Sequence, residues 1–391
     1  MVRNAIAIVA SLAFVLALAP AAGAGQCPTT PLVSGLKGPS KLVFSAKNNL
    51  LVAESGDALN AGRVSIVDPE TGARRTLLDG LPAGISIEGG ISGPSGLAVR
   101  GRSLYVTIGA GDGVLVGPAP GSELANPNPS SPIVSSVLEV KFSASVEKKT
   151  AGFTLTPDQH ADLAAGQTVR LKNRGKDKIT VRLVADFANF VPNPRPDVPD
   201  NVRSSNPHAV EVVGNALYVA DASLNKIERV DIATGATTTL ATLGQLPNTL
   251  PFGPPMVDAV PDNVHLFDGS LLVTQLSGFP FGPGASRVSR IDLTSGAETP
   301  FITGLTTAID VLAVEGQGAA ADQYYVLEFS SNLIGDPPGP GRLLRFDDPA
   351  GEPEVLVECL VSPTSMVRDA RTGDIYIAQI FTGLIVVVAA N

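Results

Sequence analysis

Six polar residues occupy the same position in six similar segments of this sequence, near the start of a short strand-like run. They are Ser40, Ser95, His208, Asp262, Asp310 and Thr364. An imidazole and two carboxylates that converge can bind a divalent cation, with hydroxyl groups or water completing the shell. We therefore take His208, Asp262 and Asp310 as candidate ligands of a cation such as calcium. The alternative is that the six side chains only cap strand ends by hydrogen bonding to loop amides.

A second set of positions ends another strand-like run in the same segments. Its members are Glu54, Ile108, Asp221, Gln275, Glu328 and Gln379, and all but Ile108 can accept a hydrogen bond. In an antiparallel pair, the start of one strand lies beside the end of the next. We therefore expect the two sets to form a first and a second ring on one face of the molecule.

A loop rich in glycine and proline belongs to the same face. Residues 275–292 read QLSGFPFGPGASRVSRID, so Phe279 and Phe281 stand next to Pro280 and Pro283. Apolar side chains beside a few polar groups are typical of small-ligand clefts, and the two phenylalanines could form such a wall. The alternative is that both rings pack over a sheet edge.

The segments that carry these residues form an internal repeat. The runs LLVAE, LYVTI, LYVAD, LLVTQ, YYVLE and IYIAQ end at the six positions of the second ring. One strand-like run precedes each of them, and two more follow most of them, joined by a turn that contains Asp and Gly. Four strands in each of six units predict an all-β protein, a six-bladed β-propeller of the NHL/SMP-30-like kind.

Two irregularities are consistent with this architecture. The second unit carries an insertion, residues 143–177, in place of its hairpin. The sixth unit ends after its third strand, so we expect the N-terminal PLVSGLKGPS to supply the fourth strand and close the ring. Cys27 and Cys359 are the only cysteines. Export would favour a disulfide between them that reinforces this closure, and two free thiols are the alternative.

The first residues predict export from the cytoplasm. Arg3 is followed by an apolar stretch and then by small residues up to Ala24, a pattern typical of a secretory signal peptide. We predict a signal peptide at residues 1–24, a propeller at residues 25–391, and a secreted or periplasmic location. No later segment is apolar over the roughly 18 residues that a membrane-spanning helix requires.

Charge is distributed unevenly along the chain. The formal net charge of −9 argues against nucleic acid as a main partner. From Lys141 to Arg182, by contrast, nine Lys and Arg stand against four Asp and Glu. We expect this insertion to form a short capped helix, TPDQHADL, and a hairpin that projects from the face opposite the rings. It is either a docking surface or a solvated hairpin.

Common catalytic motifs are missing from the sequence. It has no GxSxG, HExxH or CxxC motif, no phosphate-binding loop ending in GK[ST], and only three histidines. A Ser-His-Asp hydrolase is therefore not expected.

Two stretches of the sequence resemble a known family. SNPHAVEVVGNALYVADASLNKIERVD and LLVTQLSGFPFGPGASRVSRID resemble the ScyD/ScyE family of exported propeller proteins, which implies a secreted six-bladed propeller. The resemblance runs from about Leu32 to the C-terminus, with residues 143–177 as an added element. The chain is more distantly similar to the calcium-dependent gluconolactonase and regucalcin propellers. His208 and Asp262 match ligand positions of those proteins, whereas Lys37 in KGPS stands where they supply a ligand glutamate.

Two functions are consistent with these patterns. The first is a non-enzymatic, monomeric binding or scaffold module that recognises a small molecule or a protein through the face with the two rings. The second is a metal-dependent hydrolase of a small ester or lactone, in which the bound cation polarises a carbonyl or activates water and Glu54 or Asp221 acts as base. Lys37 and the missing motifs favour the first. A third hypothesis is an interaction domain that uses the basic insertion.

Overall fold

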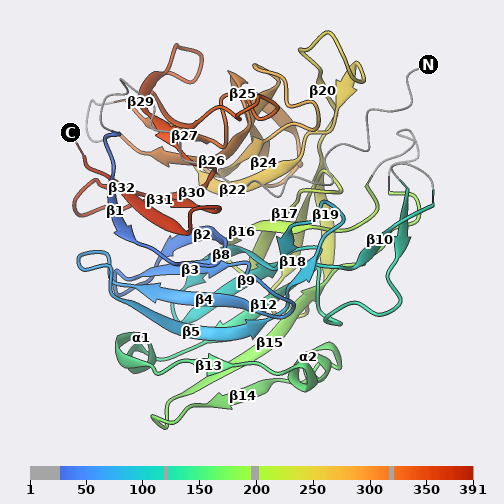
Figure 1. Cartoon of the computed structure of the whole chain (residues 1–391), viewed down its shortest axis with the longest axis vertical. Coiled ribbons are helices and arrows are strands. Elements are labelled where there is room, and N and C mark those ends of the chain that lie inside the picture. The colour runs from blue at the N-terminus through green and yellow to red at the C-terminus, as the bar shows by residue number, and fades with distance from the viewer. Residues whose placement is uncertain (1–26, 119–121, 195–201, 317–320, 391) are drawn as a thin grey trace.

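The chain folds into six sheets arranged in a ring, each built on four antiparallel strands, and the sheets of blades one and two each gain a fifth strand from the insertion (Figure 1). The computed structural model describes residues 27–118, 122–194, 202–316 and 321–390. The prediction of an all-β, six-bladed propeller is therefore confirmed. The predicted signal peptide, residues 1–24, lies outside the described residues.

In blades one, three, four and five the four strands are consecutive in the chain, whereas blade two is interrupted by shorter elements and blade six takes its fourth strand from near the N-terminus. The first strand of each blade is innermost. Blade one is formed by β2 (Pro39–Phe44), β3 (Leu50–Glu54), β4 (Gly62–Val67) and β5 (Arg74–Leu81). Blade two is formed by β8 (Pro94–Arg100), β9 (Ser103–Ile108), β12 (Ser136–Lys141) and β15 (Lys178–Asp186). Blade three is formed by β16 (Pro207–Val213), β17 (Ala216–Asp221), β18 (Lys226–Asp231) and β19 (Thr237–Thr242). Blade four is formed by β22 (Pro261–Phe267), β23 (Ser270–Gln275), β24 (Ser286–Asp292) and β25 (Glu298–Leu305). Blade five is formed by β26 (Ala308–Val314), β27 (Gln323–Glu328), β28 (Gly341–Phe346) and β29 (Glu354–Leu360). Blade six is formed by β30 (Pro363–Arg368), β31 (Ile375–Gln379), β32 (Leu384–Val388) and β1 (Thr30–Val33).

The turns between third and fourth strands follow the Asp and Gly pattern of the sequence. In blade three, Asp231 Oδ1 accepts hydrogen bonds from the N–H groups of Thr234, at 2.8 Å, and Ala233, at 3.1 Å. These bonds hold the pKa of Asp231 below its ordinary value. Gly235 closes the turn with a φ of +75°, a conformation that glycine adopts at little cost. These elements are hairpin turns, as predicted.

The ring is closed by the two ends of the chain. β1 pairs with β32 and so becomes the fourth strand of blade six. Cys27, just before β1, forms a disulfide with Cys359 in β29, and their Cα atoms are 5.9 Å apart. The bond ties the closing strand of blade six to the outer strand of blade five across 332 residues of sequence.

The hydrophobic core is divided among the junctions between blades. Six clusters of buried apolar residues each combine side chains from two neighbouring blades, and together they run around the ring. Leu217 and Val219 of blade three, for example, pack with Tyr105 and Val137 of blade two. This arrangement follows from strands whose two faces are both covered, so their residues are apolar on either side.

The insertion in blade two contains the predicted capped helix and a hairpin, but it lies elsewhere than predicted. It contains α1 (Ala144–Lys149), β13 (Phe153–Thr154), α2 (Pro157–Ala164) and β14 (Val169–Lys172). β13 pairs in parallel with β5 of blade one, and β14 pairs with β15 of blade two. The insertion therefore lies along the outer edges of these two blades (Figure 1) and is not a free hairpin on one face. The physical reason is its own apolar side chains, since Val146, Phe153 and Leu163 join the hydrophobic cluster between blades one and two.

The helix expected over TPDQHADL is present as α2. The Thr156 side chain accepts a hydrogen bond from the N–H of Gln159, and the Gln159 side chain accepts one from the N–H of Thr156. This capping box satisfies donors at the helix start that have no partner within the helix. No helix among the described residues is long and apolar enough to cross a membrane.

Three short two-stranded ribbons decorate the loops that lead into and out of the blades. They are β6 (Gly84–Ile85) with β7 (Ile91–Ser92), β10 (Val114–Val116) with β11 (Glu123–Ala125), and β20 (Leu246–Pro247) with β21 (Met256–Val257). All three lie in connections between second and third strands or between fourth strands and the next blade. Such connections share one face of an antiparallel propeller, which we call the loop face.

Candidate functional site

The hydroxyl groups of the first ring link neighbouring blades. Ser40 Oγ donates to the carbonyl of Pro94 at 2.8 Å, and Ser95 Oγ donates to that of Pro207 at 2.9 Å. Thr364 Oγ1 donates to the carbonyl of Pro39, also at 2.9 Å. Each bond runs from the innermost strand of one blade to that of the next. These three side chains therefore stabilise the ring around the channel.

His208 and Asp262 meet in the same way at the junction of blades three and four. The Nδ1 atom of His208 lies 2.6 Å from the Asp262 carboxylate and 2.9 Å from the Asp262 carbonyl oxygen. Burial alone would lower the pKa of His208, but the neighbouring carboxylate raises it above its ordinary value. His208, whose side chain is 30% exposed, and Asp262, which is 6% exposed, thus form a short contact between neighbouring inner strands.

Asp310 is held by a different set of partners. Its carboxylate lies 3.1 Å from Lys41 Nζ, and Lys41 Nζ also donates to Asn263 Oδ1 at 2.8 Å. The Asp310 carboxylate also accepts hydrogen bonds from the side-chain amide of Asn263 and from two main-chain N–H groups. These belong to Val311, at 2.9 Å, and to Met366, at 2.8 Å. Only 2% of the Asp310 side chain and 14% of that of Lys41 is exposed. Lys41 was not among the predicted site residues.

These contacts determine how the predicted metal ligands are arranged. His208 and Asp262 lie together, but the Asp310 carboxylate is occupied by Lys41, Asn263 and two main-chain donors. Within the described ranges, no group of three or more His, Cys, Asp and Glu side chains is placed to hold a metal ion. Calcium requires six to eight oxygen ligands, and a lysine ammonium already supplies positive charge here. The residues present therefore do not fit a calcium centre.

A second histidine lies deeper along the same strands. His265 Nδ1 is 3.8 Å from the carboxylate of Glu211. Burial lowers the pKa of His265 and raises that of Glu211, so both groups are driven toward their neutral forms. Lys41 adds to the lowering at His265 and opposes the rise at Glu211. The His265–Glu211 contact, at 3.8 Å, is longer than the His208–Asp262 and Lys41–Asp310 contacts, at 2.6 and 3.1 Å.

The second ring is used to fasten the loops that lead into the inner strands. Four of its side chains accept a hydrogen bond from a main-chain N–H in the segment just before the first strand of their own blade. The bonds run from Lys37 to Glu54 (2.7 Å), Asn206 to Asp221 (3.0 Å), Thr306 to Glu328 (2.7 Å) and Val361 to Gln379 (2.5 Å). Buried main-chain donors need such partners, so this ring is part of the scaffold.

The charges of this ring are also compensated from within the blades. Arg74 lies 3.0 Å from Glu54, and Arg342 lies 2.5 Å from Glu328. Gln275 donates to Glu298 at 2.6 Å and accepts from Arg287 at 3.1 Å. Burial raises the pKa of Asp221 and of Glu328, although the hydrogen-bond donors beside each carboxylate act in the opposite direction. None of these groups is left free to act as a base on a ligand.

Of the two phenylalanines predicted to form a loop wall, Phe279 is open to solvent. Phe279 is 39% exposed, and its ring meets that of Phe281 edge to face with centroids 6.2 Å apart. The loop is pinned by hydrogen bonds from Leu276, Ser277 and Gly278 N–H groups to the carbonyls of residues 258–260. Phe279 is therefore presented on a rigid support, while Phe281 packs partly inward.

Exposed large apolar side chains gather on the loop face. Among the described residues, twelve such side chains are exposed, and eleven of them lie in connections of this face: Leu59, Ile85, Leu115, Val116, Leu124, Phe252, Met256, Phe279, Ile334, Val361 and Phe381. The remaining one, Val355, lies in the outer strand β29. Phe381 is 74% exposed and stacks edge to face on Phe329. Of this set, the sequence pattern identified only Phe279.

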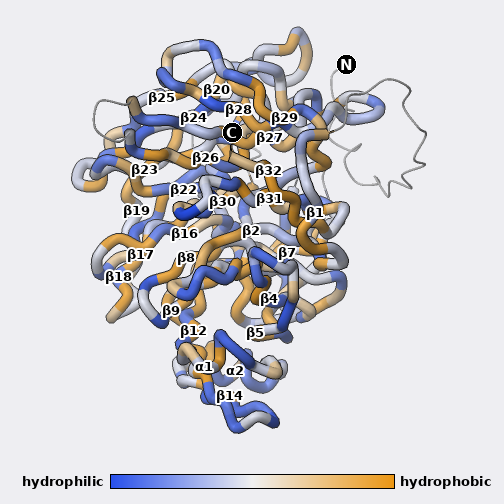
Figure 2. Tube along the Cα trace, turned by 90° about the vertical axis from the view of Figure 1, so that its left-hand side faces the viewer, coloured by the Kyte–Doolittle hydropathy of each residue, from blue (hydrophilic) through white to orange (hydrophobic). Residues whose placement is uncertain are grey.

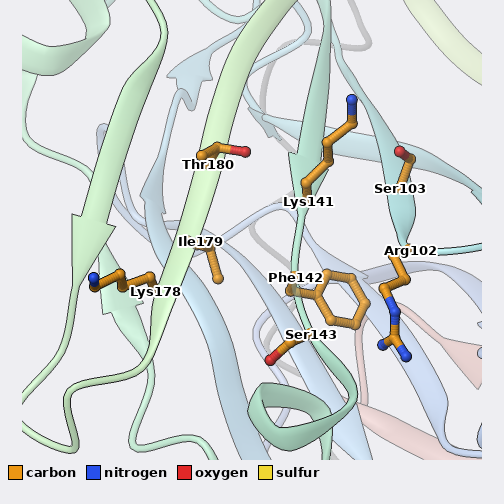
Figure 3. A pocket seen from close by; sticks show the side chains of 8 residues that line it. All are labelled: Arg102, Ser103, Lys141, Phe142, Ser143, Lys178, Ile179 and Thr180. Atoms are coloured by element: carbon orange, nitrogen blue, oxygen red, sulfur yellow. The ribbon is translucent and has the colours of Figure 1, made fainter.

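Two hollows were also found at the surface. One, of about 120 Å³, lies on the loop face and is lined by serines, an asparagine and Glu88. The other, of about 380 Å³, lies where the insertion leaves blade two (Figure 3). Its floor is formed by Phe142 and Ile179, but Lys141 and Lys178 extend away from the Phe142 ring in different directions (Figure 3). This second hollow therefore lacks a convergent set of charges.

The His208–Asp262 pair predicts a pH dependence that can be measured. Because the folded-state pKa of His208 is raised, its stabilisation is present below its unfolded value, about 6.5, and is lost as the pH rises through the folded pKa. We expect Asp262→Asn to lower this pKa. Titration of the three histidine ring protons by NMR tests this, and an unchanged His208 pKa in the variant would show that the carboxylate does not control it.

Comparisons with known proteins support the fold. The chain matches no protein-family model and no curated protein. Similar solved structures are an auxiliary nutrient-binding protein from Bacteroides thetaiotaomicron (TM-score 0.50, 10% identity, 90% of this chain and 69% of that one) and a putative phosphatase from the same organism (TM-score 0.49, 11% identity, 91% and 72%). A catalytically inactive virginiamycin B lyase from Staphylococcus aureus is also similar (TM-score 0.45, 14% identity, 93% and 98%). The first similarity supports the propeller fold, and none of them bears on the chemistry of this chain.

Proposed function

We propose that this chain is an exported propeller of the ScyD/ScyE type that acts as a binding module through its loop face, without catalysing a reaction. The observation that carries the proposal is the gathering of exposed apolar side chains on that face, eleven of twelve among the described residues. Contiguous exposed apolar surface on a folded protein marks an interaction site more often than chance. The partner is a small molecule or a protein with an apolar surface of its own.

Rigid aromatic anchors make the loop face suited to this role. Phe279 is held by the pinned loop, and the connection that contains Phe252 packs against it, since a Cβ atom built on Gly253 would lie 3.4 Å from Pro280 Cδ. Aromatic residues held in place lose little conformational entropy when they bind. Phe381, supported by Phe329, supplies a second anchor on the same face.

The hydrolase alternative has no comparable support. Its cation would need the Asp310 carboxylate, which Lys41 and Asn263 occupy, and its base would need Glu54 or Asp221. Glu54 is bound by Arg74 and by the N–H of Lys37, and Asp221 by Ser205 and Asn206. No step of a metal-assisted reaction can be assigned to groups that are already engaged in this way.

The proposed exported location is supported by the disulfide. A bond between Cys27 and Cys359 persists in an oxidising compartment and is rare in the cytosol. The N-terminal signal pattern at residues 1–24 points the same way. Expression of the full chain with a C-terminal tag, followed by sequencing of the N-terminus of the exported product, tests whether cleavage follows Ala24.

Photo-crosslinking tests the binding role directly. We expect benzoylphenylalanine placed at Phe279 to form a discrete adduct in the extracellular medium or periplasm of the producing cells. The same group at Val355, which is 46% exposed but lies outside the loop face, is expected to form none. Adducts at both positions, or at neither, would contradict recognition by the loop face.

Serine substitutions of the loop-face phenylalanines should weaken binding without unfolding the protein. We expect Phe252→Ser and Phe279→Ser together to reduce capture of that partner, because aromatic hot-spot residues contribute about 2 kcal/mol or more each. Val355→Ser is the control and should leave capture unchanged. Thermal unfolding of all three proteins should agree, since surface substitutions usually change stability by less than about 0.5 kcal/mol.

A further inference from the structure

We propose that the outer sheet face of the insertion is a second binding surface, which takes an acidic polysaccharide. The surface, called here the basic face, is formed by Lys141 of β12, Lys178 of β15, and Arg170 and Lys172 of β14. This inference is independent of the loop face and of the function proposed for it.

The strand register places these four cations on one side of the extended sheet of blade two. Lys141 lies opposite Thr180, and Thr180 lies opposite Arg170, so the three form one row across β12, β15 and β14. Lys172 and Lys178 form the next row of the same face. Adjacent strands are about 4.8 Å apart and alternate residues of a strand about 7 Å, so the charges are regularly spaced. Val169 and Leu171, which point the other way, are buried.

The positive charges of the basic face are not neutralised by the protein. Arg170, Lys172 and Lys178 have no ion pair among the described residues, and Lys141 is 3.4 Å from Glu139, whose carboxylate is mainly bound by Arg182. Lys172 and Lys178 also face each other directly across the two strands. Like charges in directly opposed positions destabilise a sheet. A ligand with closely spaced negative charges would remove this repulsion.

The basic face also stands out against the rest of the molecule. Lys141 to Arg182 carries nine Lys and Arg against four Asp and Glu, whereas the rest of the chain carries nineteen against thirty-three. Figure 2 shows the β14 hairpin as hydrophilic along most of its length, at the extremity of the insertion. A polyanion is therefore attracted to this end of the protein and repelled by the remainder, which orients it on approach.

The kind of polyanion follows from what the basic face lacks. None of the exposed large apolar side chains lies in the insertion, so nothing is available to enter a membrane. Phe153 of the insertion and Phe142 just before it are buried, so unpaired bases have no ring there on which to stack. A flat, polar and regularly charged surface suits a linear polymer that carries carboxylate or sulfate groups along its length.

Charge-matched variants test this proposal. The full chain is titrated with alginate, which carries carboxylates, with dextran sulfate, and with neutral dextran, at about 50 mM salt, where exposed charges are weakly screened. We expect binding to at least one acidic polymer and none to dextran. The variant Arg170→Thr/Lys172→Thr/Lys178→Thr should bind the acidic polymer at least about tenfold more weakly than the unmodified protein, because each lost contact is electrostatic. Threonine maintains the preference of these positions for a strand.

The control removes the same charge elsewhere. Lys37→Thr/Lys47→Thr/Arg229→Thr changes three exposed cations outside the insertion and should bind acidic polymer as the unmodified protein does. Phe252→Ser/Phe279→Ser should also bind it normally, which separates this site from the loop face. Equal loss in the two triple variants, no binding to either acidic polymer, or tighter binding to a single-stranded oligonucleotide or to phosphatidylglycerol vesicles would each overturn the proposal.

Discussion

Replacing Asp310 with alanine is expected to lower the free energy of unfolding by about 3–5 kcal/mol, the cost of breaking a buried ion pair from one side. The substitution leaves the Lys41 ammonium, of which only 14% is exposed, beside the amide of Asn263 without a counter-charge. It also removes the acceptor of the Met366 N–H group of the next blade. Urea unfolding followed by far-ultraviolet circular dichroism measures the change.

A double substitution separates the charge from the packing. Lys41→Met/Asp310→Asn removes both charges while it retains an acceptor for Met366, so much of the stability lost in Asp310→Ala should return. If Asp310→Ala costs less than about 1 kcal/mol, the pair is not the desolvated contact described here. The double variant also leaves the channel without the lysine that occupies it in the native chain.

Removal of the disulfide is expected to have an effect of similar size. Cys27→Ser/Cys359→Ser should lower the free energy of unfolding by about 2–5 kcal/mol, because the bond restrains a very long loop in the unfolded chain. The bond joins residues 332 apart and secures β1, the strand that closes blade six. Urea unfolding of the variant, and of the unmodified protein under reducing conditions, measures the loss.

Hydrogen exchange distinguishes a disulfide that secures the closing strand from one that acts only on the unfolded chain. We expect hydrogen exchange in the Cys variant to rise in β1 and β32 before it rises in blades two to four, since closure of the ring depends on this strand. A uniform rise in all six blades would show that the bond acts only on the unfolded chain. No change in stability would mean that the pairing of β1 with β32 closes the ring without it.

The blades were predictable from the sequence because their signals are local. The continuous apolar runs within LYVAD and IYIAQ and the turn glycines such as Gly235 act over fewer than ten residues, and most blades repeat them. The closing role of the N-terminal strand was also predictable, since a sixth unit with only three strands requires a partner.

The roles of the ring residues were not predictable in the same way. Position along a strand shows which side chains reach the channel but not which donors lie beside them. Asp310 is neutralised by Lys41, 269 residues away in the sequence, and Glu54 by Arg74, which is 20 residues away on a strand of the same blade. Carboxylates that resembled free ligands are therefore engaged in the structure of the ring.

In the insertion, too, local features were predictable from the sequence and long-range contacts were not. Its capped helix α2 was predicted from Thr156 and Gln159, which are neighbours in the chain. The parallel pairing of β13 with β5 was not, because Phe153 and its partner Leu78 are far apart in the sequence and only two residues take part. Its location along the rim of blades one and two depends on apolar contacts that a local pattern does not reveal.

We infer that the polar rings hold the propeller together and that recognition takes place elsewhere, on its loops. Calorimetric titration of calcium into metal-stripped protein, with Asp262→Ala in parallel, tests this claim most directly. We predict no saturable heat for either protein, because the Asp310 carboxylate is already bound by Lys41 and Asn263. Tight calcium binding that is lost in Asp262→Ala would contradict the claim and return the metal-dependent hydrolase to first place.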